Sequence, residues 1–205
     1  KTTKQGKAFM AEHKGQILLN NSDAYALDQM MLSMSEHPVA RGLLNGGWQG
    51  KSEQSDFAVD PETGLDVKCR PDFILNDGSL IIDLKTTLDA SPKGFQRSLV
   101  SYRYYVQAAF YMDVVEMATG TRPVAFLFIA CEKQRPFEVG AYCADHAMIE
   151  VGREHARRDL QKIAEWKASN TWPGYSDRAE IISLPKWMLP KEDRTSADPQ
   201  PIDLY

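Results

Sequence analysis

An aspartate inside an otherwise apolar stretch constrains the possible folds of this chain more than any other feature. Residues 80–84 read Leu-Ile-Ile-Asp-Leu, and a lysine, Lys85, follows them directly. A run of apolar and β-branched residues predicts a strand, and an acid within a buried strand costs several kcal/mol unless it is paired or binds a metal. Because strand side chains alternate, we expect Asp83 and Lys85 on one face, roughly 6–7 Å apart.

A second acid stands on the other side of a predicted tight turn. Residues 76–78 read Asn-Asp-Gly, which tolerate the positive φ of a short hairpin loop. Asp72 opens the partner strand, so it can meet Asp83 and Lys85 across the sheet. Two carboxylates and a lysine that converge at a sheet edge suit a magnesium-dependent phosphodiesterase.

The composition is that of an ordinary globular domain. The 205 residues are 43% hydrophobic, which favours one domain, or at most two, with a proper core. The net charge of −4 does not indicate a nucleic-acid binder, although a local basic channel is compatible with it. No apolar run reaches the ~18 residues of a membrane span, and the first residues lack the apolar core of a secretory leader, so we expect neither. Three scattered cysteines without CxxC spacing indicate reduced thiols, so we expect a cytoplasmic protein.

Helical and strand patterns alternate along the chain. Their order predicts an α/β (α+β) domain with a mixed central sheet flanked by helices. Helices are expected at residues 3–13, 23–36, 39–44, 98–119 and 145–168; strands at 51–59, 65–69, 72–75, 80–84, 124–130 and 137–142; loops at 60–64 and 91–94; and a short edge strand or docked segment at 181–187.

Several segments together carry a family resemblance. Pro71-Asp72 and Asp83-x-Lys85 fit the PD-(D/E)XK nuclease pattern, which is weakly specific by itself but stands here in a strand–turn–strand–helix context. With these motifs, residues 68–72, 83–87, 102–111 and 183–187 resemble the RecE (exonuclease VIII) family of phage-type recombination exonucleases. The resemblance covers about residues 37–188.

This resemblance implies a fold and an activity. The fold is the restriction-endonuclease-like PD-(D/E)XK core shared with lambda exonuclease. The activity is Mg²⁺-dependent 5′→3′ digestion of one strand of linear double-stranded DNA to 5′-mononucleotides, with Mn²⁺ as a substitute metal, in a bacterial or phage-infected cell. A toroidal trimer or tetramer and a single-strand annealing protein (RecT/Bet-like) are the implied partners. Residues 1–189 would form one nuclease domain that lacks an upstream segment, and residues 190–205 a Pro-rich tail.

The expected catalytic centre combines metal ligands with a lysine. Asp72, Asp83 and the backbone carbonyl of Leu84 are the candidate ligands, and Lys85 would orient or deprotonate the attacking water. Glu53, expected on a strand, matches a position where the family carries another acid, so it is a further candidate; the alternative is a surface acid.

The predicted helix over residues 98–119 supplies further candidates. The resemblance gives Gln107 an active-site role. Tyr104 and Tyr111 share its helix face and are candidate DNA contacts. Arg97 and Arg103 are candidate DNA phosphate contacts. The alternatives are a satisfied buried amide, core aromatic residues and ordinary surface charges.

One family feature has no match in the sequence. RecE-like nucleases carry an active-site histidine on an upstream helix, whereas His13, His37, His146 and His155 have no metal-like spacing and are interpreted as structural or exposed. Two rival functions stay open. One is another RecB-like nuclease, an endonuclease or a CRISPR-associated enzyme, although three scattered cysteines argue against the four-cysteine iron–sulfur cluster of the latter. The other is a non-catalytic DNA-end-binding subunit.

Overall fold

The computed structural model describes residues 3–176, 178–185 and 188. Two compact units are present, Lys1–Gln161 and Lys162–Tyr205. All strands of the described chain lie in the first unit. The predicted boundary between residues 189 and 190 lies outside the described residues and stays a prediction.

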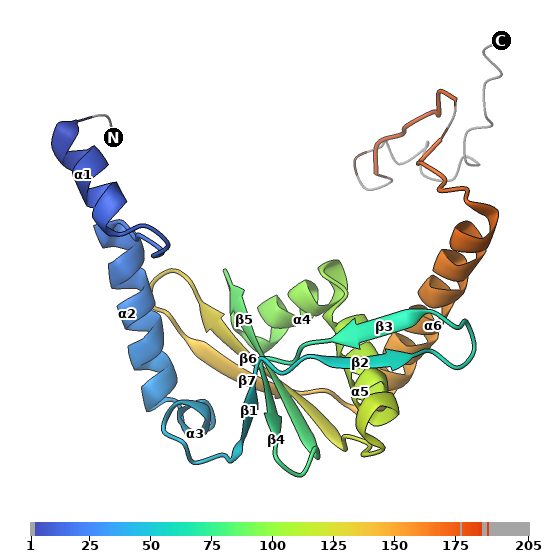
Figure 1. Ribbon diagram of the computed structural model, residues 1–205, viewed down its shortest axis with the longest axis horizontal. Helices are drawn as coiled ribbons and strands as arrows, with labels where there is room; N and C mark the ends of the chain where they lie inside the picture. Colours follow the sequence, from blue (N-terminus) through green and yellow to red (C-terminus); the bar gives the residue numbers. More distant parts are fainter. Residues whose placement is uncertain (1–2, 177, 186–187, 189–205) are drawn as a thin grey trace. The chain divides into compact units, whose positions relative to one another are not determined.

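A five-stranded mixed sheet forms the centre of the first unit (Figure 1). Its order is β1-β4-β5-β6-β7, in which β5 and β6 are parallel and every other neighbouring pair is antiparallel. The apolar runs of the sequence became its central strands, so the predicted mixed sheet is confirmed. The strands are β1 (Gly50–Ser52), β4 (Phe73–Leu75), β5 (Leu80–Thr87), β6 (Ala125–Glu132) and β7 (Val139–Cys143).

The turn between β4 and β5 follows the sequence prediction. Gly78 has a φ of 72°, which glycine adopts without steric cost. The Asp77 carboxylate accepts hydrogen bonds from the backbone N–H and the hydroxyl of Ser79. Strand β5 continues to Thr87, three residues beyond the predicted run, so Lys85 lies inside the strand.

The single strand predicted over residues 51–59 is wrong. The segment divides at Glu53, whose φ is 54° and whose N–H donates to the carbonyl of Asp72. Beyond this break, β2 (Asp56–Val59) pairs with β3 (Asp66–Cys69) in a separate two-stranded sheet. No glycine or proline marks the break, which is why the sequence pattern did not reveal it. The hairpin between β2 and β3 was predicted and is confirmed.

The helix predicted over residues 98–119 is two helices, and the predicted loop over 91–94 is the start of the first. Ser91 caps α4 (Pro92–Ser101) by accepting a hydrogen bond from the N–H of Gly94, and Pro92 occupies the first helical position. A break at Arg103, which has a left-handed φ of 56°, separates α4 from α5 (Tyr104–Thr119). The other helices agree with their predicted ranges to within two residues: α1 (Lys4–Glu12), α2 (Asn21–Glu36), α3 (Arg41–Leu44) and α6 (His146–Ser169).

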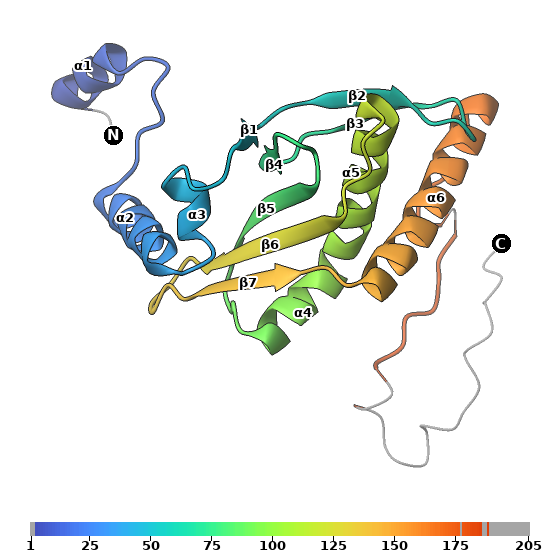
Figure 2. The same ribbon diagram turned by 90° about the horizontal axis from the view of Figure 1, so that it is seen from below.

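Helices cover both faces of the sheet (Figure 2). On one face, Ile81 and Phe128 pack with residues of α4 and α5. On the other face, Ile82 and Ile129 pack with Met34 of α2 and with the residues around α3. Because side chains alternate along β5, the odd-numbered positions Asp83 and Lys85 belong to the face that α4 and α5 cover.

The second unit contains the end of α6, followed by residues 170–176 and 178–185, which form no helix or strand. No strand forms among residues 181–185, so the predicted edge strand is absent from the described part of that segment. Residues 186–187 and the predicted tail at 190–205 lie outside the described residues. Within the described chain, no helix has the length and apolar character needed to cross a membrane.

Candidate active site

The side chains of Asp83, Lys85 and Gln107 form a closed polar cluster between β5 and α5. The ammonium of Lys85 contacts Oδ2 of Asp83 in an ion pair and donates to Oε1 of Gln107 at 2.9 Å. Nε2 of Gln107 donates to Oδ1 of Asp83 at 2.7 Å. Each group therefore touches the other two, and the amide has both of its ends engaged. The predicted convergence of Asp83, Lys85 and Gln107 is what the structure shows.

The helix break at Arg103 gives α5 a separate start beside this cluster. Tyr104 is the first residue of α5, and Gln107 lies about one turn further along the same side. The ring of Tyr104 lies 4.6 Å from the ammonium of Lys85, a cation–π contact. Tyr104 is therefore in contact with the cluster, as the sequence predicted for its helix face.

Tyr111 also lies next to the cluster, and its side chain is half-buried. Burial raises the pKa of its phenol, the charge of Asp83 raises it further, and hydrogen bonds from Gln107 and from the backbone of Arg70 oppose the rise. These contacts tie α5 to the chain that leads into Asp72. Its predicted DNA contact stays a prediction.

Asp72 approaches the cluster from the residue directly before β4, the strand that pairs with β5. Its Oδ2 accepts a hydrogen bond of 2.7 Å from the N–H of Leu84, which lies between the two polar residues of β5. The side chain of Leu84 belongs to the opposite face and is half-exposed. The hairpin therefore holds the carboxylate of Asp72 against the strand that carries Asp83 and Lys85.

The carboxylate of Asp83 is in a strongly desolvating environment. Only 2% of the residue is exposed, and this burial raises its pKa. The charge and hydrogen bond of Lys85 act in the opposite direction, the charge of Asp72 adds to the rise, and Gln107 opposes it; the net result is a raised pKa. Asp83 is thus a carboxylate whose charge needs a cation beside it.

The donor set fits a magnesium ion. Oδ2 of Asp83 is buried and has the ammonium of Lys85 as its partner, and the nearby Asp72 offers a second carboxylate. Mg²⁺ prefers oxygen ligands and retains several waters, so two carboxylates suffice. Within the part of the chain that the structure describes, no three His, Cys, Asp or Glu side chains gather closely enough to bind an ion together.

Glu53 does not join this pair of acids. Its carboxylate forms a 2.7 Å ion pair with Arg70, and both side chains are more than half exposed. Only its backbone N–H reaches Asp72. Its predicted strand position is wrong because the left-handed backbone at Glu53 ends β1 before that residue. Its ligand role remains a prediction without support from the structure.

The two predicted arginine contacts lie outside the cluster. Arg103 forms a 2.5 Å ion pair with Asp159 of α6, so its guanidinium is engaged away from Lys85. Arg97 is exposed on α4 and lines a neighbouring cleft. The structure therefore brings together Asp72, Asp83, Lys85, Gln107, Tyr104 and Tyr111, and it places Glu53, Arg97 and Arg103 elsewhere.

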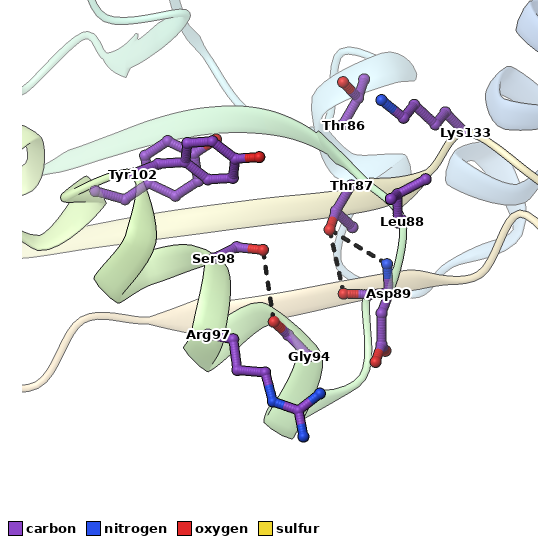
Figure 3. Close-up of a pocket in the computed structure, with 10 residues that line it drawn as sticks. Thr86, Thr87, Leu88, Asp89, Gly94, Arg97, Ser98, Tyr102 and Lys133 are labelled. Atoms are coloured by element: carbon purple, nitrogen blue, oxygen red, sulfur yellow. Dashed lines mark hydrogen bonds between the residues drawn. The ribbon is translucent and has the colours of Figure 1, made fainter. Parts of the chain in front are cut away.

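The cleft lined by Arg97 also contains two residues, Tyr102 and Lys133, that were not predicted from the sequence as site residues. It has a volume of about 430 Å³, and Figure 3 shows Tyr102 at one end and Lys133 near Thr86 at the other. Lys133 follows β6 directly, and because β6 runs parallel to β5, the ends of both strands meet at this edge. The sequence Ser91-Pro92 could have indicated the start of α4, the helix that lines the cleft.

Comparisons with known proteins agree with this fold. A putative exonuclease from Eubacterium rectale has a similar solved structure, with a TM-score of 0.62 and 15% identity over 95% of this chain and 73% of that one. A phage-related exonuclease from Haemophilus somnus is matched at a TM-score of 0.44 and 13% identity, over 81% of each chain. The first likeness supports the fold alone, and the second is too distant to argue from. No curated protein matches the chain.

A family model covers most of the chain. It matches residues 2–185 and describes a PDDEXK-like domain. The matched range contains every residue of the polar cluster, and the predicted PD-(D/E)XK core is confirmed. The chain belongs to the family described as PDDEXK-like domain of unknown function (DUF3799).

Proposed function

We propose that this protein is a metal-dependent DNA exonuclease. The observation that carries the proposal is the closed cluster of Asp83, Lys85 and Gln107, with Asp72 held beside it, on a PD-(D/E)XK fold. A buried acid, a paired lysine and an amide that bridges them are suited to phosphodiester hydrolysis, in which negative charge develops around the phosphate.

Each residue has a distinct role in the proposed reaction. Asp72, Asp83 and the carbonyl of Leu84 would hold Mg²⁺, and Mn²⁺ would serve in its place. The metal would supply charge neutralisation at the phosphate and a lowered pKa for a bound water. Lys85 holds a proton at Nζ beside Asp83, where it can orient the attacking water and stabilise the developing oxyanion. Gln107 fixes Lys85 and Asp83 relative to one another.

The finer features of the proposal come from the family resemblance. They are 5′→3′ polarity on one strand of linear duplex, release of 5′-mononucleotides, and a remaining 3′ single strand for recombination by strand annealing. A toroidal trimer or tetramer and a single-strand annealing protein belong to the same proposal. Enclosure of the DNA within a ring would give processivity without a strongly basic surface, which is consistent with a net charge of −4.

End-labelled DNA tests this function directly. Linear duplexes labelled at the 5′ or the 3′ end are incubated with the protein in Mg²⁺ or in EDTA. We expect early release of the 5′ label as a mononucleotide, only in Mg²⁺. Lys85→Ala and Asp72→Ala should lower the rate by about 100-fold or more, whereas Lys68→Ala, an exposed lysine on β3, should retain it.

The same assay separates the rival functions. A fully active Lys85→Ala protein of native circular dichroism would refute the proposed mechanism. Cleavage of covalently closed circles would identify an endonuclease instead. Binding of duplex ends without any hydrolysis, in either metal, would identify a non-catalytic end-binding subunit.

A further inference from the structure

The cleft beside the polar cluster is connected to it through one aromatic side chain. Tyr104 contacts the ammonium of Lys85 at 4.6 Å, and it stacks on Tyr102 with a centroid distance of 5.4 Å. Both tyrosines line the cleft, which has a volume of about 430 Å³. A molecule in the cleft would therefore lie directly next to the lysine that is proposed to act on the phosphate.

Tyr102 presents an aromatic surface at one end of the cleft (Figure 3). Its ring is nearly parallel to that of Tyr104, at an interplanar angle of 26°, and 69% of the residue remains exposed. Stacking on Tyr104 fixes the ring without covering it. Such a fixed, exposed ring is a surface on which a nucleic-acid base of any sequence can stack.

Two cationic side chains line the same cleft. Arg97 projects from α4, and Lys133 lies near Thr86 at the end opposite Tyr102 (Figure 3). Neither cation takes part in an ion pair among the residues that the structure describes. The acid Asp89 also lines the cleft and lies near Arg97, which helps to lower the pKa of its carboxyl after the hydrogen bonds from Ser91. Two cations and one acid leave the cleft with an excess of positive charge.

We propose that this cleft binds one unpaired nucleotide of the strand being cut, with its base stacked on Tyr102 and its flanking phosphates near Arg97 and Lys133. A base within a duplex is stacked and paired, so its face cannot reach Tyr102 until the strand separates. The cleft thus selects a DNA strand whose bases are already unpaired where it passes the polar cluster. This inference rests on the proposed nuclease function, because it assigns part of the DNA path of that site.

Binding to a single-stranded probe tests the inference without any cleavage. A fluorescein-labelled oligothymidylate is titrated in EDTA with the wild-type chain and its variants, and fluorescence anisotropy gives the affinity. Tyr102→Ala should weaken binding about tenfold, and Tyr102→Phe should retain it because the ring is kept. Arg97→Ala and Lys133→Ala should each weaken binding and reduce its dependence on salt. Phe57→Ala is the matched control, since Phe57 is 67% exposed on β2 in the other sheet.

The outcomes decide the inference independently of hydrolysis. Unchanged affinity in Tyr102→Ala, or no binding of the probe by the wild-type chain, overturns it. An equal loss of affinity for a closed duplex without ends overturns the selection for unpaired strand. If the probe binds through Tyr102 but no DNA is ever hydrolysed in Mg²⁺, the cleft assignment stands and the proposed catalytic function fails.

Discussion

At the scale of single residues, Gln107 decides the arrangement of the site. Its amide has one acceptor end and one donor end, and these match an ammonium and a carboxylate respectively. A leucine, which has a similar size, offers neither a donor nor an acceptor. The sequence could indicate that Gln107 lies on the helix near the strand, but not that it bridges both charged groups.

Substitutions of Gln107 test whether its two hydrogen bonds are needed for activity. Gln107→Glu places a third acid beside Asp83 and removes the donor, so we expect a loss of about 100-fold in the rate of duplex digestion. Gln107→Leu should cause a similar loss without added charge. Single-turnover rates across a range of Mg²⁺ concentrations provide the measurement. Gln96→Leu, on the exposed side of α4, is the control, and a fully active Gln107→Leu would show that the bridge is dispensable.

At the scale of elements, one buried ion pair joins the β2–β3 hairpin to α6. Asp60 is fully buried at the end of β2, where Arg157 donates to both of its carboxylate oxygens at 2.8 and 3.0 Å. Thr63 donates from its N–H and its hydroxyl. Burial raises the pKa of Asp60, but the hydrogen bonds from Thr63 and Arg157 outweigh it, so the pKa lies below its usual value.

This pair should make stability depend on pH in the acid range. A carboxyl whose folded-state pKa is lowered stabilises the fold above its unfolded pKa of about 3.9, and this contribution is lost as the pH falls through the folded pKa. Asp60→Asn should lower the free energy of unfolding by about 3 kcal/mol at pH 7 and flatten its decline below about pH 4. Urea unfolding between neutral and acid pH measures both effects.

The exposed acid on the same arginine is the control for this prediction. Glu62 lies 3.3 Å from Arg157 and is 59% exposed at its side chain. Glu62→Gln should therefore change the free energy of unfolding by at most about 1 kcal/mol. Equal losses in the two variants would show that burial does not set the strength of the pair.

At the scale of the whole molecule, metal binding should be coupled to folding. Asp83 lies on β5 and Asp72 directly before β4, so an ion held by both would link segments that separate on unfolding. A ligand that binds only the folded state stabilises it by mass action. Magnesium at tenfold its dissociation constant would add about 1.4 kcal/mol, which corresponds to a rise of roughly 3–6 °C in melting temperature.

Thermal unfolding in MgCl₂ and in NaCl of equal ionic strength tests this coupling. We expect the rise in the wild-type chain and its absence in Asp83→Asn. Glu53→Gln serves as the comparison, because the carboxylate of Glu53 is paired with Arg70 and does not join Asp72 and Asp83. A lost metal response in Glu53→Gln would support the predicted ligand role of Glu53, and an unchanged response in Asp83→Asn would contradict the proposed site.

The local signals of the sequence predicted most elements and failed where the backbone adopts a rare conformation. Alternation, apolar runs and the turn at residues 76–78 placed the strands and helices that the structure contains. Glu53 and Arg103 both have positive φ without being glycine, and nothing in their neighbouring residues signals this. One break divides a predicted strand between two sheets, and the other divides a predicted helix and gives α5 its own start.

The sequence by itself determined that Asp83 and Lys85 share one face of a buried strand, because the two-residue period of a strand is a local property. It also determined that an acid at that depth needs a partner or a metal, because burial of a charge is costly in any fold. Only the tertiary structure decided that Gln107 bridges the pair, that Arg103 turns to α6, and that Lys133 and Tyr102 meet in one cleft. Those contacts depend on the parallel pairing of β5 with β6 and on how α5 packs across the sheet, and such long-range packing leaves no periodic trace in the chain.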